Sequence, residues 1–340
     1  MILPSLYRQF TPMVGCMLVL CLTAFAHADP PRDCAWIDDD GERLACHDRA
    51  DGRIAAASVP SGSSEKANST LAAPASLIEQ AWGFSPSAPR YLLRYHEMNY
   101  LLPITHTSDR NIEPWEPFRD LEIQDGEINY DDAETKFQLS FKYRLWVTDD
   151  RKLGVWLRYT QLSTWQLYNA DESSPFRDTN YQPELLVSYN PGRAIGSFRW
   201  SLLNLGINHE SNGRSNILSR SWDRIFAEAG FEKGNFALLA KAWYRIPESD
   251  ADDDNPDITD YYGYGQVRAF YSWRDRTFTL MGRGNPKRGK GAVQLSYVSR
   301  PLMGPLRGYL QLFHGYGETM IDYNWNQTVV GAGVAINSIL

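Results

Sequence analysis

The sequence predicts an all-β fold, a closed antiparallel transmembrane β-barrel of twelve strands, and three observations predict it. Past residue 28 of the 340-residue chain there is no apolar run of the length that a spanning helix needs. Aromatic residues make up 13% of the chain, although its mean hydropathy is only −0.43. This combination is typical of barrels, whose apolar residues are spread over alternate positions. From about Arg90 onward, segments of alternating polar and apolar residues are separated by turn residues.

The N-terminus has the features of a secretory signal peptide. Arg8 supplies a positive charge, residues 13–25 form an apolar run, and residues 26–28 read Ala-His-Ala, a small-x-small cleavage site. We therefore expect residues 1–28 to be removed and the mature chain to begin at Asp29. A lipoprotein anchor on Cys16 is the weaker alternative, because the segment before this cysteine is short and polar.

The mature chain is predicted to open with a short periplasmic extension over residues 29–76. Cys34 and Cys46 are expected to form one disulfide in this oxidising compartment. The bond closes a small loop and should stabilise the folded extension by about 2 to 3 kcal/mol in the chain-entropy model. A metal site that also uses His47 is the alternative. From residue 55 the extension is rich in Ala, Ser and Pro, so we expect a flexible linker before a barrel domain that covers residues 77–340.

The strand pattern is clearest over residues 136–147 and returns in the last predicted strand. One face of the first strand is apolar and consists of Phe137, Leu139, Phe141, Tyr143, Leu145 and Val147, whereas the other consists of Lys136, Gln138, Ser140, Lys142 and Arg144. The last strand places Val330, Ala332, Val334 and Ile336 opposite Gly331, Gly333, Ala335 and Asn337. A soluble sandwich also alternates, but rarely with such long side chains on one face of so many strands. A barrel with a polar lumen is expected to show this pattern.

The twelve predicted strands are centred near residues 96, 141, 158, 185, 203, 227, 240, 266, 279, 295, 311 and 333. An even number fits a closed bacterial barrel with both termini in the periplasm. Odd-numbered strands then run outward, so the turn between the fifth and sixth strands is expected on the extracellular side, near the outer leaflet.

The two strands around that turn carry residues of catalytic type on their apolar faces. His209 and Ser211 are two positions apart, so in an extended strand their side chains leave the same face about 6.6 Å apart at the backbone. Counting back by twos reaches Ile207, which identifies this face as the apolar one. Asp223 is in phase with Ile225 on the returning strand. A strand-end histidine or a serine alone indicates little, but a hairpin that brings a carboxylate, an imidazole and a hydroxyl together favours a functional site.

Residues 209–215 read His-Glu-Ser-Asn-Gly-Arg-Ser, and residues 219–224 read Ser-Arg-Ser-Trp-Asp-Arg. Together these runs closely resemble the signature of bacterial outer-membrane phospholipase A. Supporting similarity lies in residues 173–181, 254–259 and 315–324, within a stretch that extends from about residue 90 to the C-terminus. Several ordered motifs over that length are far more specific than a bare His-x-Ser.

The resemblance implies a calcium-dependent hydrolase that cleaves the acyl esters of glycerophospholipids, with A1, A2 and lysophospholipase activity. In this family Ser211 corresponds to the nucleophile, His209 to its general base and Asp223 to the third member of the set. A serine hydroxyl is a poor nucleophile until a base takes its proton, and the base must be held in one tautomer. The family pattern has Asn where this chain has Asp223. A carboxylate also accepts the imidazole N–H and stabilises imidazolium, so the substitution is chemically compatible with the role.

The resemblance also implies a calcium site made of hard oxygen ligands. The matching positions are the carbonyl of Arg214, the hydroxyl of Ser219 and the carbonyl of Ser173, the last supplied in the family by the partner subunit. The backbone N–H of Gly213, with a calcium-bound water, corresponds to the oxyanion hole. A second family site uses Asp254 together with an acidic residue. This chain departs from that pattern, because Asn216 stands at the position of the acidic residue.

In the family the substrate is membrane phospholipid, and the enzyme is active as a homodimer and resting as a monomer. Gln161 matches a position in the barrel-barrel contact, with pairing inside its own barrel as the alternative. The net charge of −7 argues against a nucleic-acid partner. The predicted location is the bacterial outer membrane, crossed by all twelve strands.

Three further interpretations concern features outside this set. A porin-like channel or structural barrel without esterase activity is the alternative function, in which polar lumen residues line a pore. His96, His106 and His314 are expected to be structural. The acidic loop over residues 250–257 is expected to be solvated and extracellular, with divalent-ion binding as the alternative.

Overall fold

The computed structural model describes residues 76–119 and 130–338. The predicted signal peptide, Cys34, Cys46 and the linker lie outside these residues, so their assignments stay predictions. Among the described residues no helix has both the length and the apolar character that a membrane span requires.

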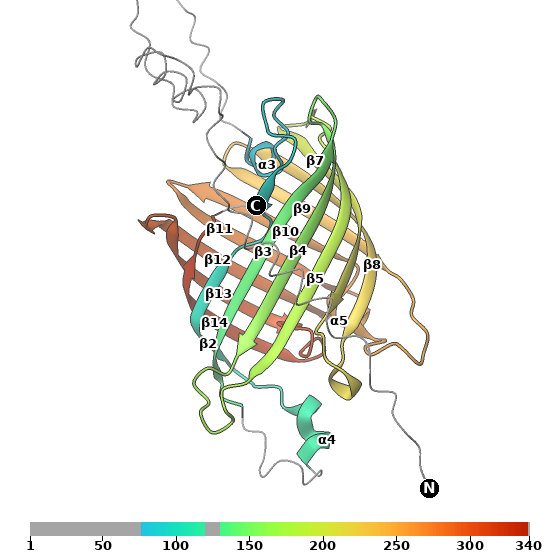
Figure 1. Cartoon of the computed structure of the whole chain (residues 1–340), viewed down its shortest axis with the longest axis vertical. Helices are drawn as coiled ribbons and strands as arrows, with labels where there is room; N and C mark the ends of the chain where they lie inside the picture. Colours follow the sequence, from blue (N-terminus) through green and yellow to red (C-terminus); the bar gives the residue numbers. More distant parts are fainter. Residues whose placement is uncertain (1–75, 120–129, 339–340) are drawn as a thin grey trace, which may run out of the picture. The chain divides into compact units, whose positions relative to one another are not determined.

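In this part of the chain fourteen strands form one antiparallel sheet, and all but two short ones make the wall of a closed barrel (Figure 1). The twelve wall strands are β2 (Tyr100–Thr107), β3 (Ala133–Val147), β4 (Leu153–Trp165), β5 (Phe176–Tyr189), β7 (Phe198–Ser211), β8 (Ser221–Lys233), β9 (Phe236–Arg245), β10 (Gly265–Trp273), β11 (Arg276–Asn285), β12 (Lys290–Met303), β13 (Leu306–Tyr316) and β14 (Asn326–Ala335). Each pairs with its neighbours, and β14 pairs with β2 to close the ring. The predicted twelve-stranded antiparallel barrel is therefore confirmed.

Two short strands and several short helices accompany the strands of the wall. Strand β1 (Leu93–Tyr95) pairs with β3, and β6 (Arg193–Ile195) pairs with β7. The helices are α3 (Leu77–Trp82), η2 (Glu113–Trp115), α4 (Glu116–Arg119), η3 (Asn216–Leu218) and α5 (Ile258–Tyr262). Long connections at one end of the barrel include residues 166–175, 212–220 and 246–264, whereas the opposite end has tight hairpins such as residues 234–235 and 274–275.

Eleven of the predicted strand centres fall inside wall strands, but the first, near residue 96, was wrong. It lies in the break between β1 and β2. At this break the side chain of Asn99 replaces backbone pairing, because its Nδ2 donates to the Ser140 carbonyl at 2.9 Å and its Oδ1 accepts the Ser140 N–H at 2.7 Å. His96 turns inward and is buried near Glu97 and Glu184, in keeping with a structural role.

The alternation predicted for β3 is confirmed with one correction. Lys136, Ser140, Lys142 and Arg144 are buried in the lumen, and Leu139, Phe141, Tyr143 and Leu145 are exposed on the outer wall. Val147, predicted on the outer face, is only 3% exposed. The register with β4 shifts between Arg144 and Trp146, so two successive residues face outward and Val147 is turned inside. In β14 the predicted faces are confirmed, with Val330 exposed and Gly331 and Ala335 buried.

The lumen is filled by paired charges. Glu184 forms an ion pair with Arg158 at 2.6 Å and accepts a hydrogen bond from Lys241 at 2.7 Å, and Arg158 also lies 3.4 Å from Glu228. Such pairing is required because an unpartnered buried charge is strongly destabilising. A polar cavity of about 230 Å³ remains between these side chains. The interior is therefore largely a hydrogen-bonded core.

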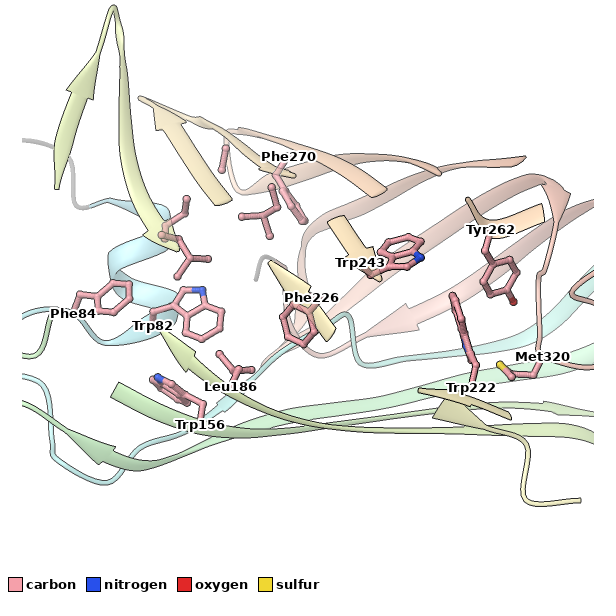
Figure 2. Close-up of a cluster of buried hydrophobic side chains, with 14 of the residues drawn as sticks. Trp82, Phe84, Trp156, Leu186, Trp222, Phe226, Trp243, Tyr262, Phe270 and Met320 are labelled. Atoms are coloured by element: carbon pink, nitrogen blue, oxygen red, sulfur yellow. The ribbon is translucent and has the colours of Figure 1, made fainter. Parts of the chain in front are cut away.

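Helix α3 closes this core at the end with the tight hairpins. The Ser76 side chain caps its first turn by accepting from the Glu79 N–H, and Gly83 ends it with a φ of 59°. Trp82 packs edge-on against Trp156, with ring centroids 5.4 Å apart. Figure 2 shows both rings within a cluster of buried hydrophobic side chains contributed by several strands.

Candidate functional site

The hairpin of β7 and β8 carries the three residues predicted to be catalytic. In its register His209 is directly opposite Asp223, and Ser211 is opposite Ser221. Ile207 and Ile225, which share the face of His209 and Asp223, are exposed on the outer wall, whereas Asn208 and Arg224 on the opposite face are buried in the lumen. The predicted face assignment is confirmed, because Ser211 and His209 leave the outer side of the same strand.

His209 and Asp223 form a hydrogen bond on this outer face. Nδ1 of His209 lies 2.9 Å from Oδ1 of Asp223, and each side chain is 46% exposed. A proton on Nδ1 that is donated to the carboxylate leaves Nε2 free to act as a base. Among the described residues no hydrogen bond joins Ser211 to His209, although both lie on one face two positions apart. The hairpin thus holds an oriented base near a hydroxyl at the loop end of the barrel.

The turn after Ser211 requires glycine at position 213. Gly213 has a φ of 62°, in the left-handed region, and a Cβ built there lies 2.9 Å from the ring of Tyr181. Asn216 also has positive φ, at the start of η3. These constraints shape the turn over residues 212–220, one of the long connections, which carries Gly213, Arg214 and Ser219.

Two of the predicted calcium ligands meet in the structure. The hydroxyl of Ser219 donates to Oδ2 of Asp254 at 2.5 Å, which joins the turn to the loop after β9. Both groups are hard oxygen donors of the kind that calcium selects, so the residues fit this ion. Ser173 is exposed in the turn between β4 and β5 and has a φ of 59°. Within the described ranges no group of three or more His, Cys, Asp or Glu side chains could hold a metal ion.

The loop after β9 borders the hairpin on the other side. The N–H of Ile246 donates to the carbonyl of Asp223 at 2.8 Å, and Arg245 pairs with Asp253 at 2.5 Å. Partial burial raises the pKa of Glu248, and the nearby carboxylates of Asp253, Asp223 and Asp254 act in the same direction, whereas Arg245 lowers it. The acidic loop is therefore partly tied to the site by ion pairs and hydrogen bonds.

An inner-face cluster behind the site was not predicted from the sequence. Arg224 pairs with Glu210 at 2.5 Å, the Trp222 indole N–H donates to Glu210 at 3.0 Å, and the Arg224 guanidinium lies 3.8 Å from the Trp222 ring centroid. Arg224 also donates to Asn208. The alternation indicated that Arg224 points inward, but nothing local indicated its partners.

Other predicted polar residues find partners in their own barrel. Nε2 of Gln161 donates to Ser163 at 3.3 Å and its Oε1 accepts from the Tyr159 hydroxyl at 3.1 Å, which agrees with the intramolecular alternative. Nδ1 of His314 lies 2.9 Å from the Thr328 hydroxyl, consistent with a structural role.

The comparisons with known proteins agree on one family. The family model described as Phospholipase A1 matches residues 82–336. A phospholipase A1 of Klebsiella pneumoniae is 40% identical, over 73% of this chain and 84% of that protein. The solved structure of outer membrane phospholipase A from Escherichia coli is 38% identical with a TM-score of 0.67, over 73% of this chain and 99% of that one.

A second solved structure extends this agreement. It is a Salmonella typhi outer membrane phospholipase dimer with bound calcium, 37% identical to this chain with a TM-score of 0.68. The match covers 78% of this chain and 98% of the Salmonella chain. The barrel fold and these relatives indicate a location in the bacterial outer membrane. The chain therefore belongs to the phospholipase A1 family, whose members are enzymes that hydrolyse ester bonds of phospholipids.

Proposed function

We propose that Ser211, His209 and Asp223 hydrolyse the acyl esters of membrane glycerophospholipids on the outer wall of the barrel, with A1, A2 and lysophospholipase activity. The observation that carries the proposal is the 2.9 Å hydrogen bond between His209 and Asp223 on the face that also bears Ser211. A site on this wall lets a phospholipid present its ester without leaving the bilayer. The alternative of a pore has less support, because paired charges and α3 fill much of the lumen.

The chemistry follows from the roles of these side chains. Nε2 of His209 takes the proton of the Ser211 hydroxyl as Oγ attacks the ester carbon, while Asp223 holds the ring and stabilises the imidazolium. The carbonyl oxygen becomes an oxyanion, toward which the Gly213 N–H donates. Collapse breaks the bond to glycerol, and His209 gives its proton to the departing alkoxide. Water then cleaves the acyl-enzyme by the same steps, with His209 again taking and returning the proton.

Calcium is the proposed cofactor. The Arg214 carbonyl and Ser219 hydroxyl would hold it together with the carbonyl of Ser173 of the partner subunit, and Asp254 is the candidate for a second site. Bound there, the ion would supply positive charge close to the developing oxyanion. The support is the contact between Ser219 and Asp254 and the hard-oxygen character of the set. Asn216 lacks the charge of an acidic ligand, which weakens the second site.

We also propose the arrangement of the protein in the membrane and its assembly. The N-terminus is periplasmic, which agrees with α3 lying at the end that has the short hairpins, so the site lies at the extracellular end. The active form is a homodimer and the resting form a monomer. A related phospholipase from Salmonella typhi forms a dimer with bound calcium, which supports the assembly.

The decisive experiment measures calcium-dependent release of fatty acid from phospholipid by wild type and Ser211→Ala. We expect release by wild type, none by the variant, and labelling of Ser211 by a sulfonyl fluoride. Excess chelator should abolish release while leaving the barrel folded. Ester hydrolysis that survives in Ser211→Ala would overturn the assignment of the nucleophile. Conductance across a planar bilayer without esterase activity would favour the channel instead.

A further inference from the structure

The turn over residues 212–220 is organised by one buried side chain. Asn212 is only 3% exposed, although the residues that follow it, such as Gly213 and Ser215, are exposed. Its Nδ2 donates to the carbonyl of Leu218 at 2.8 Å, and its Oδ1 accepts the Arg220 N–H at 3.0 Å. The same Oδ1 accepts the Arg214 N–H at 3.3 Å. One amide thereby joins the two ends of the turn.

The geometry points to Asn212 as the positioning residue of the proposed calcium site, an inference that rests on the proposed function. The Asn212 side chain holds the peptide groups on both sides of Ser219. It bonds to the Leu218 carbonyl before this serine and to the Arg220 N–H after it. The peptide that precedes the Arg214 carbonyl is held through the Arg214 N–H. Asn212 therefore orients the backbone of both residues whose oxygens are proposed to bind the ion from this chain.

A second anchor holds the outer part of the turn. The Arg214 guanidinium donates to the carbonyl of Arg177 at 2.6 Å and to that of Phe176 at 3.1 Å, both at the start of β5. The backbone N–H of Asn212 also donates to the Arg220 carbonyl at 3.0 Å. None of these bonds uses the side-chain amide of Asn212. We therefore expect the turn to keep its place on the barrel when only that side chain is changed.

Asparagine is required here because the site needs a donor and an acceptor in one planar group. Two N–H groups point at Oδ1 and one carbonyl accepts from Nδ2. These partners establish which of the two side-chain atoms is the oxygen and which is the nitrogen. In Asn212→Asp a carboxylate oxygen would face the Leu218 carbonyl, so the turn would lose a hydrogen bond and gain a repulsion. The peptide group between Leu218 and Ser219 would then lose its anchor, whereas the Arg220 N–H could still donate to a carboxylate oxygen.

The experiment compares Asn212→Asp with Asn216→Asp, an identical substitution at an exposed position of the same turn. Added negative charge by itself should attract calcium, so Asn216→Asp should not raise the calcium concentration for half-maximal fatty-acid release. Asn212→Asp should raise that concentration about tenfold or more, the usual cost of losing a group that orients metal ligands. Calcium binding by isothermal titration calorimetry on the full chain in detergent should show the same order without reference to activity.

Each outcome has one meaning. A calcium requirement for Asn212→Asp equal to that of wild type overturns the positioning role, as does an equal rise in both variants. A wild type that neither binds nor requires calcium removes the proposed function itself. If Asn212→Asp fails to give the heat-modifiable mobility of a folded barrel, Asn212→Ser takes its place. The shorter hydroxyl keeps one donor and one acceptor, and its calcium requirement should also rise above that of wild type.

Discussion

The two faces of the β7 and β8 hairpin differ in how their polar groups are held. On the outer face His209 and Asp223 are each about half exposed and bond to each other. On the inner face Arg224 is buried and contacts Asn208 and Glu210 while lying over an indole ring. We infer that the buried contacts of the inner face clamp the two strands and so help the proposed catalytic side chains on the outer wall to keep their geometry.

The contrast has a physical cause. An unpaired charge in the lumen is costly, so inner charged residues lie beside partners of opposite charge. The outer polar residues lie at the last positions of β7 and the first of β8, close to the wet rim, where a charge against lipid costs less. The proposed catalytic site therefore lies on the less constrained face, and we expect the buried inner face to hold it in position.

The largest expected effect comes from removing the outer-face chemistry itself. His209→Ala and Ser211→Ala should each lower the rate of fatty-acid release by about 10⁴-fold, because either loss prevents activation of the hydroxyl. The measurement is calcium-dependent hydrolysis of phospholipid vesicles, with near-UV circular dichroism as the check on folding. A folded variant within about tenfold of wild type would contradict the assigned roles.

The next effect tests the inner-face clamp. Arg224→Met leaves the partly buried Glu210 without its charged partner, so we expect a loss of about 2 to 3 kcal/mol in the free energy of unfolding and a lower activity per folded molecule. Arg144→Met is the matched control. Arg144 is also a buried arginine, but it donates to the Gly83 carbonyl at 2.8 Å at the opposite end of the barrel. It should destabilise the barrel without lowering the activity of folded molecules.

A double variant sharpens this test. Glu210→Gln with Arg224→Met removes both charges, so it should recover part of the stability lost in Arg224→Met alone. Urea unfolding of Arg224→Met, Glu210→Gln and the double variant, each compared with wild type, measures the coupling. Strictly additive changes would show that the two side chains do not act as a pair, and the clamp would then need another explanation.

A smaller effect is expected at Asp223. Asp223→Asn keeps an oxygen that can accept the His209 N–H, so hydrolysis should fall by about tenfold or less, whereas Asp223→Ala should fall much further. Steady-state rates of both variants make the comparison. Equal losses in the two would mean that the carboxylate charge, and not its hydrogen bond, is what the imidazole requires.

The smallest effect is expected far from this hairpin. Replacing both Cys34 and Cys46 by Ser should leave hydrolysis unchanged and affect only the N-terminal extension, because both positions are predicted to lie in that extension. Mass spectrometry of the unreduced mature chain tests the predicted bond directly. A free thiol at both positions would favour the alternative metal site with His47.

Several structural details were beyond prediction because they depend on distant segments. Val147 points into the lumen because the register between β3 and β4 shifts before it. No residue type or pattern within β3 indicates that shift. Lys136 and Glu318 form a buried ion pair at 2.5 Å, although they are 182 positions apart in the sequence. The same holds for Ser219 and Asp254, which meet only when two loops are placed side by side.

The barrel, the strand faces and the outward direction of Ser211 and His209 could be predicted from the sequence alone. This was possible because the side chains of a strand alternate, and each face meets either lipid or a polar lumen, so composition reports orientation locally. Only the tertiary structure decided which polar groups become partners, as in the bonds of Asn212 across its turn and of Arg224 behind the site. Partner choice depends on register and closure, and these are properties of the whole sheet.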